Sequence, residues 1–332
     1  MALRVVAPFF LPSARAWAGN RVAMVMDGIA IALLLAGAMG ASVFRVPGLA
    51  QSKPSLGRDA RLVARECGEV ARPNEPKGFT RFAELDADSV PPFPSAPFSR
   101  LGRWYAFPKG NPNLIVVQDL NAPCSPPGVI RTRYPSGFPG GRGPVDFGGW
   151  NVGPEAREKR AIYFAVWIRI NGRSFENQAV GTKAGFISFG RNDKGYNEGT
   201  FFLVNPSGRQ AIQSKFTLQF KQQGIKQANG QITRNLGQNV SEVPLMTVGE
   251  WHRWEAVLHL NSRWSNDGIL RMWVDGKLVM NYSDVIYSTP DAPLGFVGFK
   301  WNPTWGGSGG VRTRDDFIDI DHIYLSGLGM ED

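Results

Sequence analysis

Residues 251–260 read Trp-His-Arg-Trp-Glu-Ala-Val-Leu-His-Leu, and the chain continues with Ile-Leu-Arg-Met-Trp-Val at 269–274, Asp-Gly at 275–276 and Lys-Leu-Val-Met-Asn-Tyr at 277–282. Side chains alternate across a strand. One face of the first run therefore carries His252, Trp254, Ala256, Leu258 and Leu260. An Asp-Gly pair between two such runs is the strongest short signal for a β-hairpin. This stretch predicts three consecutive antiparallel strands.

Similar short runs, separated by turn residues, extend outward in both directions from this stretch. They are Leu114–Gln118, Val129–Tyr134, Ile162–Ile170, Gly185–Phe189, Thr200–Val204, Lys215–Lys221, Gly295–Lys300 and Phe317–Leu325. About a dozen strands with no room for crossover helices predict an all-β fold, an antiparallel β-sandwich of the jelly-roll kind. The predicted core includes Phe164, Val166, Ile168, Trp254, Leu258, Leu270, Met272 and Val274.

The strands define a domain over residues 101–328, behind a proline-rich segment over residues 51–100. Val90-Pro-Pro-Phe-Pro-Ser-Ala-Pro97 cannot form an interior strand, because proline lacks the N–H that a sheet requires. We interpret residues 51–100 as a linker or as a lead that wraps on the domain.

Residues 1–50 have the features of a targeting segment. Gly28–Phe44 carries no charged residue, three arginines precede it, and Gly48-Leu49-Ala50 follows. A basic start, a short apolar run and a small-residue exit are typical of a secretory signal peptide. An uncleaved membrane anchor and a cytosolic apolar helix are the alternatives. The first interpretation predicts a secreted, periplasmic or cell-surface protein, in which Cys67 and Cys124 either pair or stay as thiols.

Composition limits the class of protein and of partner. A hydrophobic content of 43% excludes wholesale disorder, and two cysteines exclude a disulfide-built scaffold. The formal net charge is +9, and residues 1–50 contribute only four arginines and one aspartate. Most of the basic excess therefore lies beyond the targeting segment and favours an acidic partner.

Five segments carry a resemblance to a known family. They are Gly249-Glu-Trp-His-Arg-Trp-Glu255, Asp267–Lys277, Asp319-Ile-Asp-His-Ile-Tyr-Leu-Ser-Gly327, Arg131-Thr-Arg-Tyr-Pro-Ser-Gly-Phe-Pro-Gly-Gly141 and Trp301-Asn-Pro-Thr-Trp-Gly-Gly307. Over roughly residues 100–328 the chain resembles the concanavalin A-like lectin/glucanase superfamily. Within it the chain is similar to bacterial polysaccharide-lyase-like jelly rolls related to the alginate and glucuronan lyases. The resemblance implies a carbohydrate-active domain, but this fold hosts lectins, hydrolases, lyases and adhesion modules alike.

Retaining hydrolysis of the laminarinase type and metal chemistry find little support. The hydrolases of the superfamily carry Glu-x-Asp-x-x-Glu or Glu-x-Asp-x-Glu on one strand, which supplies the two carboxylates that the reaction needs. The nearest string here, Asp315-Asp-Phe-Ile-Asp-Ile-Asp321, has no glutamate. We interpret its aspartates as turn, edge or capping residues, with structural calcium ligands as the alternative. No zinc-type spacing of His or Cys occurs, so neither a catalytic metal nor another cofactor is expected.

A lyase needs a group that neutralises the uronate carboxylate, a base for the C5 proton and a donor for the leaving oxygen. Arg131 and Arg133 alternate on one strand face and supply charge, whereas Tyr134 is the nearest phenol but turns to the opposite face. The polar face of the run 215–221 includes Gln219 and Lys221. The alternative for this polar face is a solvated outer sheet surface.

His252 and His322 are further candidates for the proton transfers, and each has a packed, hydrogen-bonded histidine as its alternative. Trp301 and Trp305 lie in a glycine-rich segment over residues 300–310, which we expect to be a loop. Their indoles suit stacking on sugar rings, and a lid that packs on the domain edge is the alternative.

These residues lead to one site hypothesis and two functions. Arg133, Gln219 and Lys221 line one groove with at least one of Tyr134, His252 and His322. The protein binds an acidic polysaccharide and cleaves it by metal-independent β-elimination, or it is a non-catalytic lectin-like or adhesion module. Nucleic acid is not expected as a partner, and a membrane is expected only through an uncleaved N-terminal segment.

Overall fold

The structure of the protein is a computed structural model, and it describes residues 72–87, 104–107, 112–149, 158–172, 181–192, 195–204, 211–219, 233–240, 246–262, 265–287, 295–306 and 310–330. In these ranges the chain forms sixteen strands and no helix. The strands are β1 (Thr80–Leu85), β2 (Trp104–Phe107), β3 (Leu114–Gln118), β4 (Gly128–Tyr134), β5 (Asp146–Gly149), β6 (Lys159–Asn171), β7 (Thr182–Asn192), β8 (Gly195–Val204), β9 (Ala211–Gln219), β10 (Thr233–Leu236), β11 (Met246–Thr247), β12 (Trp251–His259), β13 (Gly268–Val274), β14 (Lys277–Val285), β15 (Phe296–Thr304) and β16 (Asp316–Gly329).

The strands form two antiparallel layers joined at one point. Hydrogen-bonded neighbours follow the order β10-β9-β8-β7-β15-β6-β12-β13-β14. The step from β15 to β6 rests on one residue pair, Phe296 with Lys159, whereas β15 pairs with β7 and β5 over several residues. We call β2, β5, β15 and β7–β10 the β7 layer. We call β14, β13, β12, β6 and β16, with β1, β4 and β3 attached to β16, the β12 layer. The fold is the predicted jelly-roll β-sandwich.

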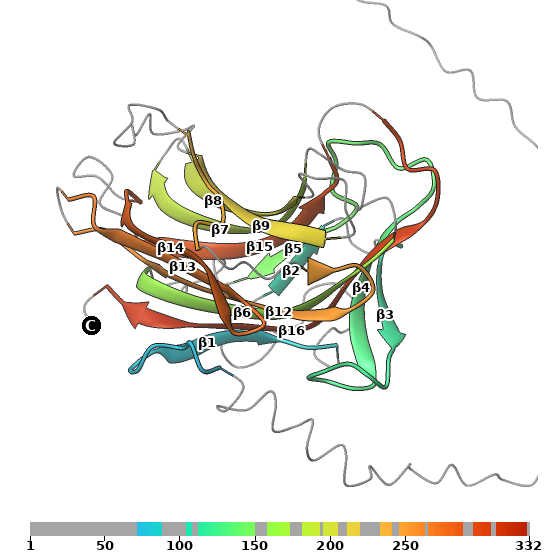
Figure 1. Cartoon of the computed structure of the whole chain (residues 1–332), viewed down its shortest axis with the longest axis horizontal. Helices are drawn as coiled ribbons and strands as arrows, with labels where there is room; N and C mark the ends of the chain where they lie inside the picture. The colour runs from blue at the N-terminus through green and yellow to red at the C-terminus, as the bar shows by residue number, and fades with distance from the viewer. Residues whose placement is uncertain are drawn as a thin grey trace, which may run out of the picture. The chain divides into compact units, whose positions relative to one another are not determined.

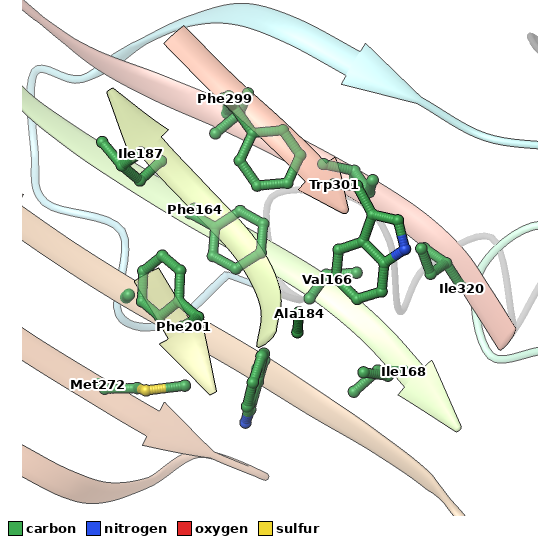
Figure 2. Packing of buried hydrophobic residues seen from close by; sticks show 14 of the residues in the cluster. Phe164, Val166, Ile168, Ala184, Ile187, Phe201, Met272, Phe299, Trp301 and Ile320 are labelled. Carbon is green, nitrogen blue, oxygen red and sulfur yellow. The ribbon is translucent and has the colours of Figure 1, made fainter. Parts of the chain in front are cut away.

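The hydrophobic core lies between these layers. Alternate side chains of the central strands point into it, as Phe164, Val166 and Ile168 of β6 do opposite Ala184 and Ile187 of β7 (Figure 2). All eight predicted core residues are at most 1% exposed. Burying a large apolar side chain contributes about 1.5–3 kcal/mol relative to leaving it exposed. The alternation that was visible in the sequence thus provides the main stabilisation of the sandwich.

The hairpin of β13 and β14 forms as predicted. Asp275 and Gly276 have positive φ angles of 50° and 76°, and Val274 pairs with Lys277 across the turn. Two successive residues with positive φ match the right-handed twist of the strands that they join. A carboxylate oxygen of Asp275 also accepts a hydrogen bond of 2.8 Å from the Arg253 backbone N–H, which ties the turn to β12.

Two segments differ from the expected pattern. Residues 80–85, within the proline-rich lead, form β1 and pair with the second half of β16. β15 continues to Thr304, although residues 300–310 were expected to form a loop. Its pairing with β7 shifts register between Trp301 and Thr304, and such an irregularity accommodates Pro303 inside a strand.

Strands β7, β8 and β9 curve together, with their concave side turned away from β6, β12 and β16 (Figure 1). Cys124, at the turn before β4, is disulfide-bonded, and the only other cysteine in the chain, Cys67, lies outside the described residues. Within the described ranges no helix has the length and apolar character needed to cross a membrane.

Candidate functional site on the outer face of the β7 layer

The two arginines of β4 face away from the core and are held by aspartates of the C-terminal segment. Arg131 donates from Nε and Nη2 to the two carboxylate oxygens of Asp319 at 2.6 and 2.9 Å. Arg133 forms an exposed ion pair with Asp315 at 2.7 Å. β4 pairs with β16, so both arginines belong to the β12 layer.

Asp319 is the centre of a larger ion cluster on that layer. Its fully buried carboxylate also accepts hydrogen bonds from Arg169 at 2.9 Å and from Asn171 at 2.6 Å. Arg169 is shared with Asp119 at 2.6 Å, and its guanidinium lies 4.5 Å from the centre of the Trp251 ring. The cluster cross-links β4, β6 and β16, which is a structural role for Arg131.

Tyr134 is fully buried in the core. Its hydroxyl donates to the Pro303 carbonyl at 2.6 Å, and the Arg312 guanidinium lies 4.5 Å from its ring centre. Burial raises the pKa of this phenol far above its usual value. A surface-bound polysaccharide cannot reach the hydroxyl, so Tyr134 does not fill the expected role of base.

His252 is held at both ring nitrogens. The Thr247 N–H donates to Nε2 at 2.8 Å, so the proton lies on Nδ1, which bonds the Asp275 carboxylate at 2.7 Å. His252 as a whole is 7% exposed. The histidine thereby fastens β11 and the β13–β14 turn to β12, in line with its packed alternative.

His322 lies on the outer face of the β12 layer, next to β1. Its Nε2 bonds Glu84 of β1 at 2.7 Å, and its ring stacks on Tyr324 at 6.5 Å. The Glu84 pKa is lowered, chiefly because this hydrogen bond stabilises the carboxylate. His322 thus joins β1 to β16.

The two tryptophans of the 300–310 segment are not equivalent stacking platforms. Trp301 is fully buried, and its indole points into the core beside Val166 and Ile320 (Figure 2). Trp305 is partly buried against the core, and the Arg312 guanidinium lies 4.4 Å from its ring centre. Trp301 therefore contributes to the hydrophobic core. The Arg312 guanidinium covers one face of the Trp305 ring.

The expected groove is not assembled from these residues. Gln219 ends β9 of the β7 layer, where the register pairs it with Glu198, whereas Arg131 and Arg133 extend from the β12 layer. Lys221 lies outside the described residues. The structure thus separates Gln219 from the arginines and from His322 by the thickness of the sandwich.

A different set of polar side chains meets on the outer face of the β7 layer. Core residues of β15 alternate with Lys300, Asn302 and Thr304, which point the other way. Residues of β5, β7 and β8 that pair with these three residues, or contact them, lie on the same outer side of the layer. We call this surface the β15 face, and it comprises Asp146, Lys183, Phe186, Glu198, Lys300, Asn302 and Thr304.

Lys300 is positioned by two neighbouring strands. Its ammonium lies 3.3 Å from Glu198 of β8 and 4.5 Å above the ring of Phe186 of β7. The Lys300 and Glu198 side chains keep 26% and 35% of their surface exposed. A cation over an aromatic ring is held by the ring quadrupole, yet this ammonium can still contact solvent or a ligand.

Asn302 is locked beside Lys300 by contacts on both sides of its amide. Its Nδ2 donates to Asp146 of β5 at 3.0 Å, and its Oδ1 accepts from Thr304 Oγ1 at 2.8 Å. Gly143 approaches it so closely that an added Cβ would lie 2.1 Å from Oδ1. The amide therefore has a fixed orientation, which is what a recognition site requires.

The alternation of Phe299, Lys300, Trp301 and Asn302 is visible in the sequence and could have indicated this face. The segment was expected to be a loop, because Pro303 and the glycines that follow are loop signals, and its alternation was therefore not interpreted as a strand. Among the described residues, no group of three or more His, Cys, Asp or Glu side chains is arranged to hold a metal ion. The β15 face instead offers two lysines, two carboxylates and a fixed amide.

Comparison with known proteins gives structural neighbours only. No family model matches the sequence, and no curated protein matches it. Similar solved structures include the alginate lyase Aly36B, with 15% identity over 62% of this chain and 83% of that one and a TM-score of 0.48. The alginate lyase vAL-1 from Chlorella virus has 16% identity over 65% and 89%, with a TM-score of 0.48. An endo-β-1,4-glucuronan lyase from the fungus Trichoderma reesei has 15% identity over 75% and 96%, with a TM-score of 0.47. At these values the likeness carries no conclusion about activity.

Proposed function

We propose that this protein is exported and binds an acidic, uronate-containing polysaccharide on the β15 face. The observation that carries the proposal is the juxtaposition of the partly exposed Lys300 side chain with the fixed Asn302–Asp146 pair. An ammonium attracts a uronate carboxylate, and carboxylate oxygens accept hydrogen bonds from sugar hydroxyls. Ligand sites typically combine a few such fixed polar groups.

Two further features support the proposal. The chain has a formal net charge of +9, which favours association with a polyanion. Cys124 is disulfide-bonded, and structural disulfides belong to oxidising compartments such as the periplasm and the cell exterior.

Binding is better supported than cleavage. β-Elimination requires a base and a proton donor at the bound uronate. Tyr134 is enclosed in the core, and His252 and His322 have internal carboxylate partners. A lectin-like module is therefore the form of the function that the geometry favours, and lyase activity is the alternative.

Calorimetry with a panel of uronate polymers and neutral glycans tests the proposal. Lys300→Ala should weaken uronate binding about tenfold, the equivalent of about 1.4 kcal/mol. Lys277→Ala removes the same charge from an exposed position on the other layer and should bind normally. Equal binding by both variants, or no binding by the native protein, would reject the β15 face as the site.

The same panel separates a lectin from a lyase. β-Elimination leaves an unsaturated sugar that absorbs in the ultraviolet. If the protein only binds, absorbance should stay constant while calorimetry reports association. A steady absorbance increase with any polymer would establish lyase activity.

A further inference from the structure

Strand β3 forms an edge of the β12 layer that is open on one side. It pairs with β4 over its whole length, and no other strand in the described ranges pairs with it (Figure 1). Its sequence is Leu-Ile-Val-Val-Gln, without a charged residue, a proline or a glycine. Ile115 and Val116 are 38% and 49% exposed. An apolar edge of this kind is a template for pairing with another strand, and proteins usually protect such edges.

Other edges of the molecule show this protection. The pairing of β1 is interrupted by a register shift between Arg81 and Ala83, and Arg81 is charged and exposed. The edge of β14 is covered by Asn239, whose N–H donates to the Val279 carbonyl at 3.1 Å and whose Oδ1 accepts from the Asn281 N–H at 2.9 Å. Within the described part of the chain, β3 has no charge, no register shift and no such cover.

The hydrogen bonds between β3 and β4 identify the backbone groups that face the open edge. The Arg133 N–H donates to the Asn113 carbonyl at 2.8 Å, and the Asp119 N–H donates to the Pro127 carbonyl at 2.7 Å. Hydrogen-bonded and non-hydrogen-bonded pairs alternate in an antiparallel ladder, so the odd-numbered residues of β3 bond β4. The even-numbered residues therefore direct their N–H and C=O groups to the open edge. They are Leu114, Val116 and Gln118.

This open edge is complementary to itself. When β3 is set antiparallel to β3 of a second copy, with Val116 opposite Val116 at a twofold axis, Leu114 lies opposite Gln118 on both sides. The three outward residues of each strand then exchange both backbone hydrogen bonds with the residue opposite. On the other face of the strand pair, Ile115 lies opposite Val117, which is a favourable apolar cross-strand pair. The pairing also sets no charge of one β3 against a like charge of the other.

From this pattern we infer that β3 pairs with β3 of a second copy and joins two molecules through one continuous sheet. A twofold contact uses the same surface on both molecules and therefore closes at the dimer. A strand of five residues is about 17 Å long, which is a small contact beside the roughly 1,600 Å² of a standard interface. The dimer should therefore dissociate on dilution. It carries two β15 faces, and two linked sites on one polymer bind with avidity.

Sedimentation velocity over a wide range of protein concentrations, without any glycan, tests this inference. The native protein should shift from monomer to dimer as its concentration rises. Val116→Lys sets two ammonium groups opposite each other at the twofold axis and should stay monomeric. Val311→Lys makes the same change at a position that is 58% exposed and lies outside β3 and β4, and this control should dimerise as the native protein does.

Val116→Pro is a second variant, and it acts on the backbone. The N–H that it removes faces the open edge, so the variant should lose the dimer and keep its melting temperature. Val117→Pro removes an N–H that bonds β4 and should lower the melting temperature. A native protein that stays monomeric at every concentration, or a Val116→Lys variant that dimerises normally, would overturn the inference. Both results leave the proposed glycan binding standing, because the dimer is measured without glycan.

Discussion

Gly143 is the residue that brings the 141–145 segment against Asn302. An added methyl group would lie 2.1 Å from the Asn302 Oδ1 and must displace that amide from its bonds to Asp146 and Thr304. Gly143→Ala should therefore weaken glycan binding severalfold with little change in melting temperature.

Gly172→Ala is the control for Gly143→Ala. Calorimetry measures glycan binding by the two variants, and thermal unfolding measures their stability. Its methyl group would lie 1.9 Å from the fully buried Asp316 at a φ of 141°, so it should lower the melting temperature strongly. If Gly143→Ala binds glycan as the native protein does, Asn302 is not part of the site.

Asp319 is the residue on which the ion cluster of the β12 layer depends. Asp319→Ala removes the shared partner of Arg131 and Arg169 and leaves two partly buried guanidiniums less well compensated. We expect a loss of about 3 kcal/mol, the lower end for breaking a buried pair, because both arginines retain some contact with water.

Denaturant unfolding at neutral pH measures this loss. Asp315→Ala breaks the exposed pair with Arg133 and should leave the unfolding midpoint nearly unchanged, since exposed pairs contribute little. Similar midpoints for the two variants would show that the buried cluster contributes no more to the free energy of unfolding than the exposed pair does.

At the scale of elements, β1 is attached to β16 by a pH-sensitive contact as well as by its backbone. The Glu84 pKa lies below its ordinary value of 4.5, because His322 hydrogen-bonds the carboxylate and Arg81 and Arg72 are nearby. A carboxylate with a lowered folded-state pKa stabilises the native state above its unfolded-state pKa. That stabilisation disappears as the pH falls through the folded-state value.

The protection factors of the β1 amides, which correct for the intrinsic slowing of amide exchange in acid, should therefore fall on acidification below about pH 4.5. Glu84→Gln should exchange faster than the native protein at neutral pH and show a weaker response to acid. Identical pH profiles for the two proteins would contradict a role for this pair in holding β1.

How far the sequence predicts these elements depends on whether the signal is local. The β12–β13–β14 stretch was predictable because alternation and the Asp275-Gly276 turn are encoded within about thirty residues. β15 was cut short because Pro303 is a loop signal, although a register shift accommodates it here. The partners of Arg131 and His322 lie 188 and 238 residues away, and alternation within a strand says nothing about which distant strand lies beside it.

At the scale of the whole molecule, the candidate binding residues and the ion cluster lie on different layers. Asn302 and Lys300 belong to the β7 layer, whereas Asp319 and His322 belong to the β12 layer. No hydrogen bond or ion pair joins these four residues across the layers, so substitutions in one set should combine additively with substitutions in the other. This separation also explains why the predicted site failed to assemble, since it drew residues from both layers.

The export proposal makes a prediction for the intact protein. Protein from the native host should begin near residue 51, or remain membrane-bound at full length, with Cys124 oxidised. N-terminal sequencing and thiol labelling of the purified protein measure both properties. A soluble cytosolic chain that retains Met1 and a reactive Cys124 thiol would contradict export.

Neighbouring positions of strand β15 should respond differently to substitution. Phe299 and Trp301 support the core, and the intervening Lys300 and Asn302 belong to the candidate binding face. A saturation library can be selected first for display and then for glycan capture. Substitutions at neighbouring positions should therefore be lost in different selections. Positions 299 and 301 would limit how much protein is displayed, while positions 300 and 302 would limit glycan capture.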